Sequence, residues 1–258
     1  MSATTVDGAS PASALPRRTA SAEAATYRWL MGAHLRSARW ALGVYVFGSV
    51  VGIVGVNHFW QIEGSVVALG RQGLIWFPFS MAIVLLAAHL PVHVQMGRTR
   101  RVLGRATVNA ALTMAACYAV AIVAVMQAER ALYAWQGWPH AILDQNVFAA
   151  DSSQVGLVLG EYLVASSAGL LCGHLVGIVY YRVGGWWGTL ALPLTVGPIL
   201  LLQVAMSTDF AFLDGDLGVG TAGGWLVRAA AALVVLGAVV VAYRLVLRGT
   251  PVRTASVL

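Results

Sequence analysis

Six long apolar runs constrain the fold of this chain more than any other feature of its sequence. They lie near 40–57, 72–90, 106–127, 155–180, 187–206 and 224–246. Each run is close to the ~20 helical residues that cross a bilayer core. The runs are continuous rather than alternating, which excludes a transmembrane β-barrel.

Composition excludes a soluble protein. Hydrophobic residues make up 59% of the 258 residues and charged residues only 10%, whereas soluble domains carry about 25% charged residues. So few charges cannot cover the surface of a soluble protein of this length. We therefore predict an all-α polytopic membrane protein with six transmembrane helices.

The distribution of arginine predicts the orientation of these helices. The chain has no lysine, so its formal net charge of +6 rests on arginine. With both termini inside, 13 arginines fall in inner segments and 3 in outer ones, and the positive-inside rule then predicts cytoplasmic termini. Because the arginines flank apolar runs instead of covering a soluble face, we expect no nucleic-acid partner.

The remaining segments divide the chain into four parts. Residues 1–25 are rich in Ala, Ser, Thr and Pro and are predicted to form a disordered cytoplasmic tail. Residues 26–39 predict an amphipathic helix, because their arginines fall on a different face from their apolar residues. This helix either anchors the first span in the membrane interface or connects to a cytoplasmic partner. Residues 40–248 form the transmembrane domain, and 249–258 a second cytoplasmic tail.

The inner connection between the second and third runs is the most informative loop. It contains Gly97, Arg98, Thr99, Arg100 and Arg101. On a helix, residues three and four apart are neighbours, so a helical stretch would place Arg98, Arg101 and Arg105 on one side. Such a short basic helix either lies on lipid phosphates or docks into a groove of a soluble protein.

Small residues recur in the fourth run at four-residue spacing. Gly169, Gly173 and Gly177 form a smooth ridge along which another helix can approach closely. We interpret this ridge as a packing surface, within one subunit or across a dimer.

Four polar residues fall inside the predicted spans and are candidates for substrate binding or proton coupling: His89, Asn109, Glu161 and His174. Glu161 is near the outer end of its span, where a side chain can also simply reach water. Cys172 and His174 are two residues apart and point to different helix faces, while a structural zinc site needs four ligands. We therefore expect no metal site and no cofactor bound by this chain.

Motifs of catalysis are missing from the sequence. A Walker phosphate loop requires lysine, so the chain cannot be its own ATPase. It also has no His-Glu-x-x-His zinc helix and no Gly-x-Ser-x-Gly nucleophile turn. We therefore do not expect an enzyme.

The order of these segments resembles the transmembrane subunit of ABC-2 type ABC transporters, particularly the short permeases of actinobacterial kind. The stretches that carry the resemblance are Gly97–Arg101 and, at the inner end of the fourth run, 177–184. The family implies an exporter subunit in the bacterial cytoplasmic membrane. It also implies a second permease copy or a related permease, and separate ATP-binding subunits that hold ATP and Mg.

In that family the loop between the second and third spans supplies a coupling helix, which here corresponds to about 92–105, with Gly97, Thr99, Arg100 and Arg101 at matching positions. The chain departs from the family at 207–223, which is short, Gly-rich and acidic where family members often have re-entrant helices. The rival interpretation is a stand-alone six-span protein in the membrane: a secondary transporter, an enzyme or a sensor.

Overall fold

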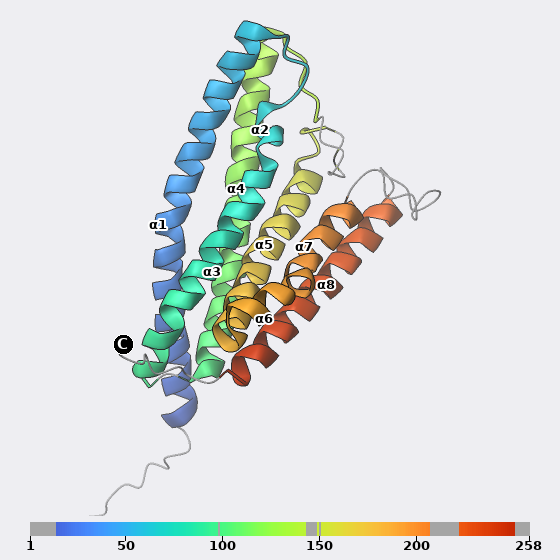
Figure 1. Cartoon of the computed structure of the whole chain (residues 1–258). Helices are drawn as coiled ribbons and strands as arrows, with labels where there is room; N and C mark the ends of the chain where they lie inside the picture. Colours follow the sequence, from blue (N-terminus) through green and yellow to red (C-terminus); the bar gives the residue numbers. More distant parts are fainter. Residues whose placement is uncertain (1–13, 98, 143–148, 150, 207–221, 251–258) are drawn as a thin grey trace, which may run out of the picture.

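The computed structural model describes residues 14–97, 99–142, 149, 151–206 and 222–250. All regular secondary structure in these ranges is helical (Figure 1). The helices are α1 (Ala14–Phe59), α2 (Val66–Leu69), α3 (Arg71–Gln95), α4 (Arg100–Gln136), α5 (Val155–Val183), α6 (Gly185–Leu190), α7 (Leu192–Met206) and α8 (Ala222–Arg248).

Six stretches of these helices are long and apolar enough to cross a membrane, so the chain is a multi-pass membrane protein. They are Ala22–Phe59, Arg71–His93, Arg100–Gln136, Val155–Val183, Gly185–Met206 and Gly224–Arg248. The prediction of six transmembrane helices is therefore confirmed at the level of length and composition.

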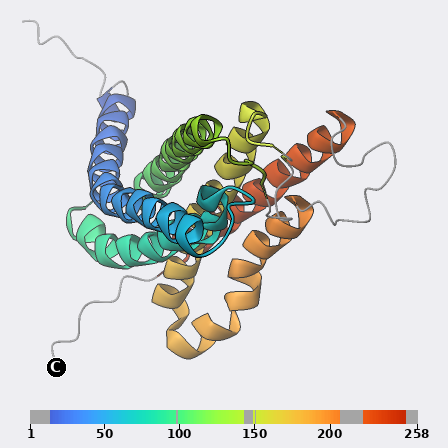
Figure 2. The same cartoon turned by 90° about the horizontal axis from the view of Figure 1, so that it is seen from above.

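The fourth span, α5, forms the centre of the bundle. In its most apolar window 89% of residues are buried, against 6% in α1. It contacts α3, α4, α7 and α8, and seen from above it runs between the group α1, α3 and α4 and the pair α7 and α8 (Figure 2). The apolar surfaces of α1, α7 and α8 are correspondingly exposed.

The glycine ridge of α5 packs against α3 in the same chain. A Cβ at Gly169 would lie 2.7 Å from the carbonyl oxygen of Ile75, and a Cβ at Gly173 would lie 2.4 Å from that of Phe79. At Gly177 the nearest atom would be the carbonyl oxygen of Ile83, at 3.2 Å. Small residues allow this backbone approach, which larger side chains would block.

Two segment boundaries differ from the sequence analysis. Residues 14–25, predicted as part of a disordered tail, are helical and continuous with the first span in α1. Alanine predominates there, and Pro16 falls in the first turn, where its missing N–H breaks no helical bond. The predicted amphipathic helix at 26–39 is therefore the middle of one 46-residue helix. Residues 1–13 and 251–258 lie outside the described residues.

The fifth span consists of two helices. α6 ends at Leu190, and α7 begins at Leu192, directly before Pro193. Proline lacks a backbone N–H, but the N–H groups of the first helical turn make no intrahelical hydrogen bond, so a new helix can start here. The connection at 207–223, expected to be a loop, falls largely outside the described residues.

The start of α1, the end of α3, the start of α4 and the end of α8 meet at one end of the bundle, which we call the arginine end (Figure 1). Glu23 in α1 forms an ion pair with Arg105 in α4 at 4.0 Å, and Arg100 donates a 3.1 Å hydrogen bond to the carbonyl of Arg248. The end of α1 and the end of α4 lie at the opposite end (Figure 1).

Candidate functional site

The connection between α3 and α4 is a tight turn and not a separate helix. α3 continues through Pro91 to Gln95, and α4 begins at Arg100. Gly97 has a φ of +68°, a conformation that favours glycine. Thr99 caps α4, because its hydroxyl accepts a hydrogen bond from the Val102 amide at 3.4 Å.

The stretch considered as a short basic helix is not separate from the spans. Arg101 and Arg105 are helical but belong to the first turns of α4, and Arg98 lies outside the described residues. The physical reason is local: a left-handed glycine followed by an N-capping threonine ends one helix and starts the next within four residues. Arg100 and Arg101 consequently occupy the first turn of a transmembrane helix.

An arginine-lined cavity opens beside this first turn. It has a volume of about 310 Å³. Its lining comes from the start of α4 and the end of α8: Arg100, Arg101, Gly104, Arg105, Arg244, Leu247 and Arg248. A Cβ at Gly104 would lie 2.9 Å from Leu247 Cδ2, so α4 and α8 touch at this level. The sequence analysis included Arg100, Arg101 and Arg105 in this region, but missed the contribution of α8.

The four predicted intramembrane polar residues do not form one site. His89 is half-buried near the arginine end, where its Nδ1 lies 2.5 Å from the Leu85 carbonyl oxygen. Asn109 is exposed, and its side-chain amide donates a 3.5 Å hydrogen bond to Glu23. His174 is buried near the middle of α5, whereas Glu161 is buried near the opposite end.

His174 belongs to a cluster of buried rings from three helices. Its ring centroid lies 5.8 Å from that of His34 in α1 and 6.3 Å from that of Tyr243 in α8. His174 Nδ1 lies 2.6 Å from the Leu170 carbonyl oxygen, and His34 Nε2 has no hydrogen-bond partner among the described residues. Among the described residues no group of three or more His, Cys, Asp or Glu side chains could hold a metal ion.

Glu161 is buried, since only 3% of it is exposed. Its Oε1 accepts a 2.8 Å hydrogen bond from the Ala149 amide. Together with Arg71 and Gln203 it lines a cavity of about 10 Å³, about the minimum that one water molecule needs. Arg228 is also buried and donates a 3.1 Å hydrogen bond to the Ala205 carbonyl.

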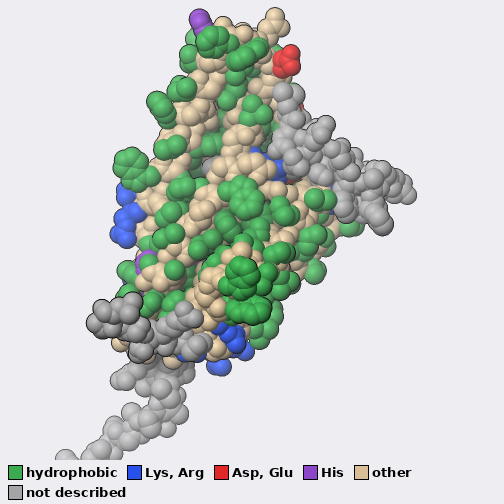
Figure 3. Space-filling view, viewed as in Figure 1, with side chains coloured by type: hydrophobic (Ala, Val, Ile, Leu, Met, Phe, Trp, Pro, Cys, Tyr) green, Lys and Arg blue, Asp and Glu red, His purple; other side chains and the backbone are tan. Residues whose placement is uncertain are grey.

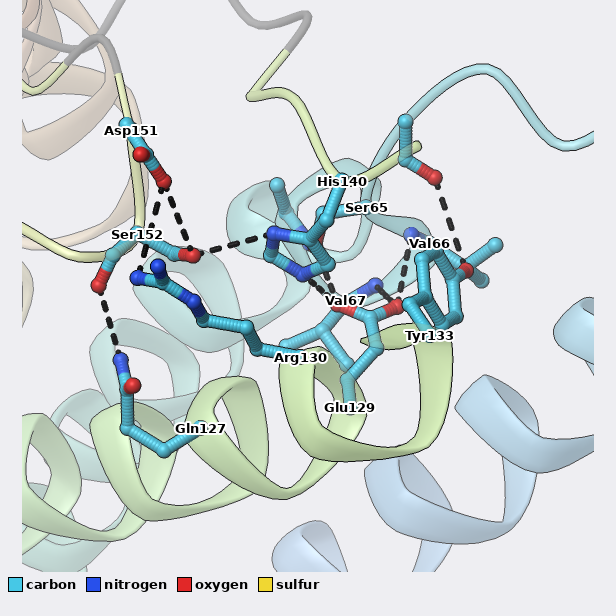
Figure 4. A network of polar contacts seen from close by, with 12 residues as sticks. Ser65, Val66, Val67, Gln127, Glu129, Arg130, Tyr133, His140, Asp151 and Ser152 are labelled. Atoms are coloured by element: carbon cyan, nitrogen blue, oxygen red, sulfur yellow. Dashed lines mark hydrogen bonds and ion pairs between the residues drawn. The ribbon is translucent and has the colours of Figure 1, made fainter. Parts of the chain in front are cut away.

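A polar network near the end of α4 centres on Glu129, which the sequence analysis did not identify as a site residue (Figure 4). Glu129 Oε1 accepts hydrogen bonds from the amides of Val66 at 2.8 Å and Val67 at 3.0 Å. Oε2 accepts a 2.5 Å hydrogen bond from the Ser65 hydroxyl and lies 3.1 Å from His140 Nε2. One carboxylate on α4 therefore holds the first turn of α2 and the loop that follows α4.

The network continues beyond His140. The Ser152 hydroxyl lies 3.0 Å from His140 Nδ1, and Gln127 donates a 2.8 Å hydrogen bond to the Ser152 carbonyl. Serine, histidine and carboxylate in this order can activate a nucleophile. However, Ser152 is 0% exposed and its hydroxyl also donates to Asp151 at 3.3 Å. Ser152 is therefore closed off from solvent among the described residues, and its contacts hold the loop that follows α4.

Asp151 forms the exposed edge of the network. The Ser153 amide at 3.0 Å and the Ser153 hydroxyl at 2.9 Å donate hydrogen bonds to its carboxylate. These bonds, with a smaller contribution from Arg130 at 3.8 Å, hold the pKa of Asp151 below its usual range. The carboxylate therefore remains charged and paired at neutral pH.

Comparison with known proteins identifies no relative of this chain. No family model matches the chain, and neither a curated protein nor a solved structure matches it. The class that the chain itself defines is a multi-pass membrane protein with an arginine-lined cavity at one end and a buried carboxylate network at the other.

Proposed function

We propose that this chain is the membrane-spanning permease subunit of an ABC transporter in the bacterial cytoplasmic membrane. In this proposal the arginine end faces the cytoplasm, and separate ATP-binding subunits hold ATP and Mg. The proposal draws on the six spans, on the arginine distribution and on the resemblance of Gly97–Arg101 to a coupling segment.

The observation that carries the proposal is the continuity of α4. This helix runs for 37 residues between the Thr99 cap and Gly137, which ends it with a φ of +72°. At 1.5 Å per residue it is about 55 Å long. Its first turn follows the connection at the arginine end, and Glu129 near its last turns holds α2 and the His140 loop. A displacement of the connection is therefore transmitted along one rigid helix to the loops at the opposite end.

Alternating access would use this helix as its moving part. Closure of the ATP-binding subunits would push the connection between α3 and α4, and the packed helices would shift between discrete arrangements. The substrate would pass between two copies of this chain, or between it and a related permease. This chain would carry out no hydrolysis of its own.

The first experiment is to purify the tagged protein from its native membrane in mild detergent and to identify bound proteins by mass spectrometry. We expect a stoichiometric ATP-binding-cassette protein. The double variant Arg100→Glu, Arg101→Glu should lose that partner while still inserting in the membrane. The matched control Arg244→Glu, Arg248→Glu carries the same charge change at the same end and should retain it. Recovery of the chain alone, under conditions that preserve known ABC complexes, would overturn the proposal.

A stand-alone secondary transporter is the second candidate, and the buried ionisable groups favour it. Glu161 and Arg228 are buried, and so are His34 and His174, whose ring centroids lie 5.8 Å apart. Ionisable residues buried in spans commonly mark proton or ion pathways. Proteoliposomes that contain this chain alone would take up protons with substrate in this case, and Glu161→Gln would abolish the uptake. Absence of uptake without an ATP-binding subunit would exclude this candidate.

A further inference from the structure

The strongest unassigned site is the arginine-lined cavity between the start of α4 and the end of α8. Five guanidinium groups surround about 310 Å³. Arg101, Arg105, Arg244 and Arg248 are exposed and Arg100 is half-buried, so an anion can reach all five. Figure 3 shows a patch of arginine at the lower edge of the molecule, where Figure 1 places the end of α8, below a largely hydrophobic face.

Within the described residues, little negative charge compensates this cluster. Glu23 pairs with Arg105 at 4.0 Å, and the carbonyl of Arg248 accepts a hydrogen bond from Arg100. No carboxylate of the described residues lines the cavity itself. Like charges held this close repel one another, and a bound anion would relieve that repulsion. The start of α4 adds the positive end of a helix dipole on the same side.

The position of the cavity in the bundle indicates the source of the anion. Arg100 is the first residue of one apolar span and Arg248 the last residue of another. Because basic side chains gather where membrane-crossing helices leave the bilayer, we place the cavity near the lipid headgroups. Its floor is apolar, because Gly104 and Leu247 are buried there and in contact. Phosphate oxygens would meet arginine, and the glycerol and acyl chains would meet the apolar floor and the neighbouring spans.

We propose that this cavity binds the phosphate headgroup of an anionic phospholipid. Basic pockets between transmembrane helices are a known way to recognise such headgroups. Arginine is suited to this task because its planar guanidinium can donate two parallel hydrogen bonds to phosphate oxygens. The bound lipid would bridge α4 and α8 and so stabilise their contact at Gly104. The proposal concerns the single chain and does not depend on the transport function.

The test uses the full chain purified in a neutral detergent. Phosphatidylglycerol, phosphatidylcholine with the same acyl chains, and inorganic phosphate are titrated separately, and binding is followed by native mass spectrometry and by the thermal unfolding midpoint. We expect saturable binding of phosphatidylglycerol with a rise in the unfolding midpoint. Phosphatidylcholine should produce neither effect, and inorganic phosphate should bind far more weakly, because it makes no contact with the apolar floor.

The variant Arg244→Gln, Arg248→Gln should weaken phosphatidylglycerol binding about 30-fold, on the basis of about 1 kcal/mol for each basic residue at a membrane surface. The control Arg36→Gln, Arg39→Gln removes the same charge from exposed positions of α1 away from the cavity, and should bind like the wild type. Should the double variant fail to fold, Arg101→Gln and Arg244→Gln are tested singly, with about 5-fold weakening expected for each.

Three outcomes would overturn the proposal. Equal weakening by the cavity variant and the α1 control would mean that only net charge matters. Equal binding of phosphatidylcholine would mean that the headgroup is not recognised. Equal affinity for inorganic phosphate would identify a site for a free anion and not for a lipid.

Discussion

Gly173 determines how closely α3 and α5 approach each other. A Cβ at this position would lie 2.4 Å from the carbonyl oxygen of Phe79 and 2.8 Å from Cβ of Ala82. Neither atom belongs to a flexible side chain, so α3 must move away from α5 to admit even one methyl group. We expect Gly173→Ala to lower the free energy of unfolding by about 1–3 kcal/mol, as overpacking of a core commonly does.

Thermal unfolding in detergent measures this effect, and Gly237→Ala in α8 serves as the control. A Cβ at Gly237 has no atom within 4 Å. Alanine there should be neutral or stabilising, because glycine in a helix interior costs about 1 kcal/mol relative to alanine. If both variants unfold at the wild-type temperature, the close contact between α3 and α5 is not what stabilises the bundle.

Buried charge at the opposite end was only partly predictable from sequence. Arg71 and Arg228 are two of the three arginines that the topology prediction assigned to outer segments, and both are 2% exposed. The positive-inside rule concerns charges in loops, so these two buried arginines carry little weight in it. The sequence identified Glu161 as a candidate, but its burial depends on α3, α5 and α7, which no local pattern brings together.

At the scale of elements, α2 is held in place by α4. Glu129 accepts hydrogen bonds from the amides of Val66 and Val67 and from the Ser65 hydroxyl. A helix of four residues cannot be stable alone, so these bonds determine whether its first turn forms. Glu129 is 4% exposed, and water cannot replace it.

Glu129→Ala should therefore release α2 and lower the free energy of unfolding by about 2–5 kcal/mol, because it leaves buried donors unpaired. Hydrogen exchange at the amides of Val66 and Val67 reports the release directly. Glu129→Gln keeps an acceptor for these amides, so their hydrogens should exchange more slowly than in the alanine variant. In Glu63→Ala, a change at an exposed position near α2, the same amide hydrogens should exchange as in the wild type. Unchanged protection in Glu129→Ala would contradict this role.

Helices were easier to predict than their connections. Local composition is enough to predict each span, and the six apolar runs lie within the six spans of the structure. The Glu129 network joins residues 62 to 64 positions apart, so its partners become neighbours only after the bundle has formed. The sequence shows the residues that form the turn, Gly97 and Thr99. It does not show that α4 starts directly after them, because a hydropathy pattern assigns the charged residues Arg100, Arg101 and Arg105 to a loop.

At the scale of the whole molecule, α4 joins the two sites. It begins in the arginine-lined cavity, packs against α1, α5 and α8, and carries Glu129 near its far end. Any ligand that changes the contact between α4 and α8 at Gly104 acts on the same rigid helix that holds α2 and the His140 loop. The two ends of the molecule are therefore joined by one continuous helix.

The proposed orientation can be tested with two exposed side chains at the two ends. Met96 is 54% exposed at the connection between α3 and α4, and Trp135 is 79% exposed near the end of α4. In a background of Cys117→Ala and Cys172→Ala, we expect Trp135→Cys to react with a membrane-impermeant maleimide in intact cells. Met96→Cys should react only in inverted membrane vesicles, because the positive-inside rule places the arginine end in the cytoplasm. The opposite pattern would reverse the orientation, and with it the side from which an ATP-binding subunit can reach the α3–α4 connection.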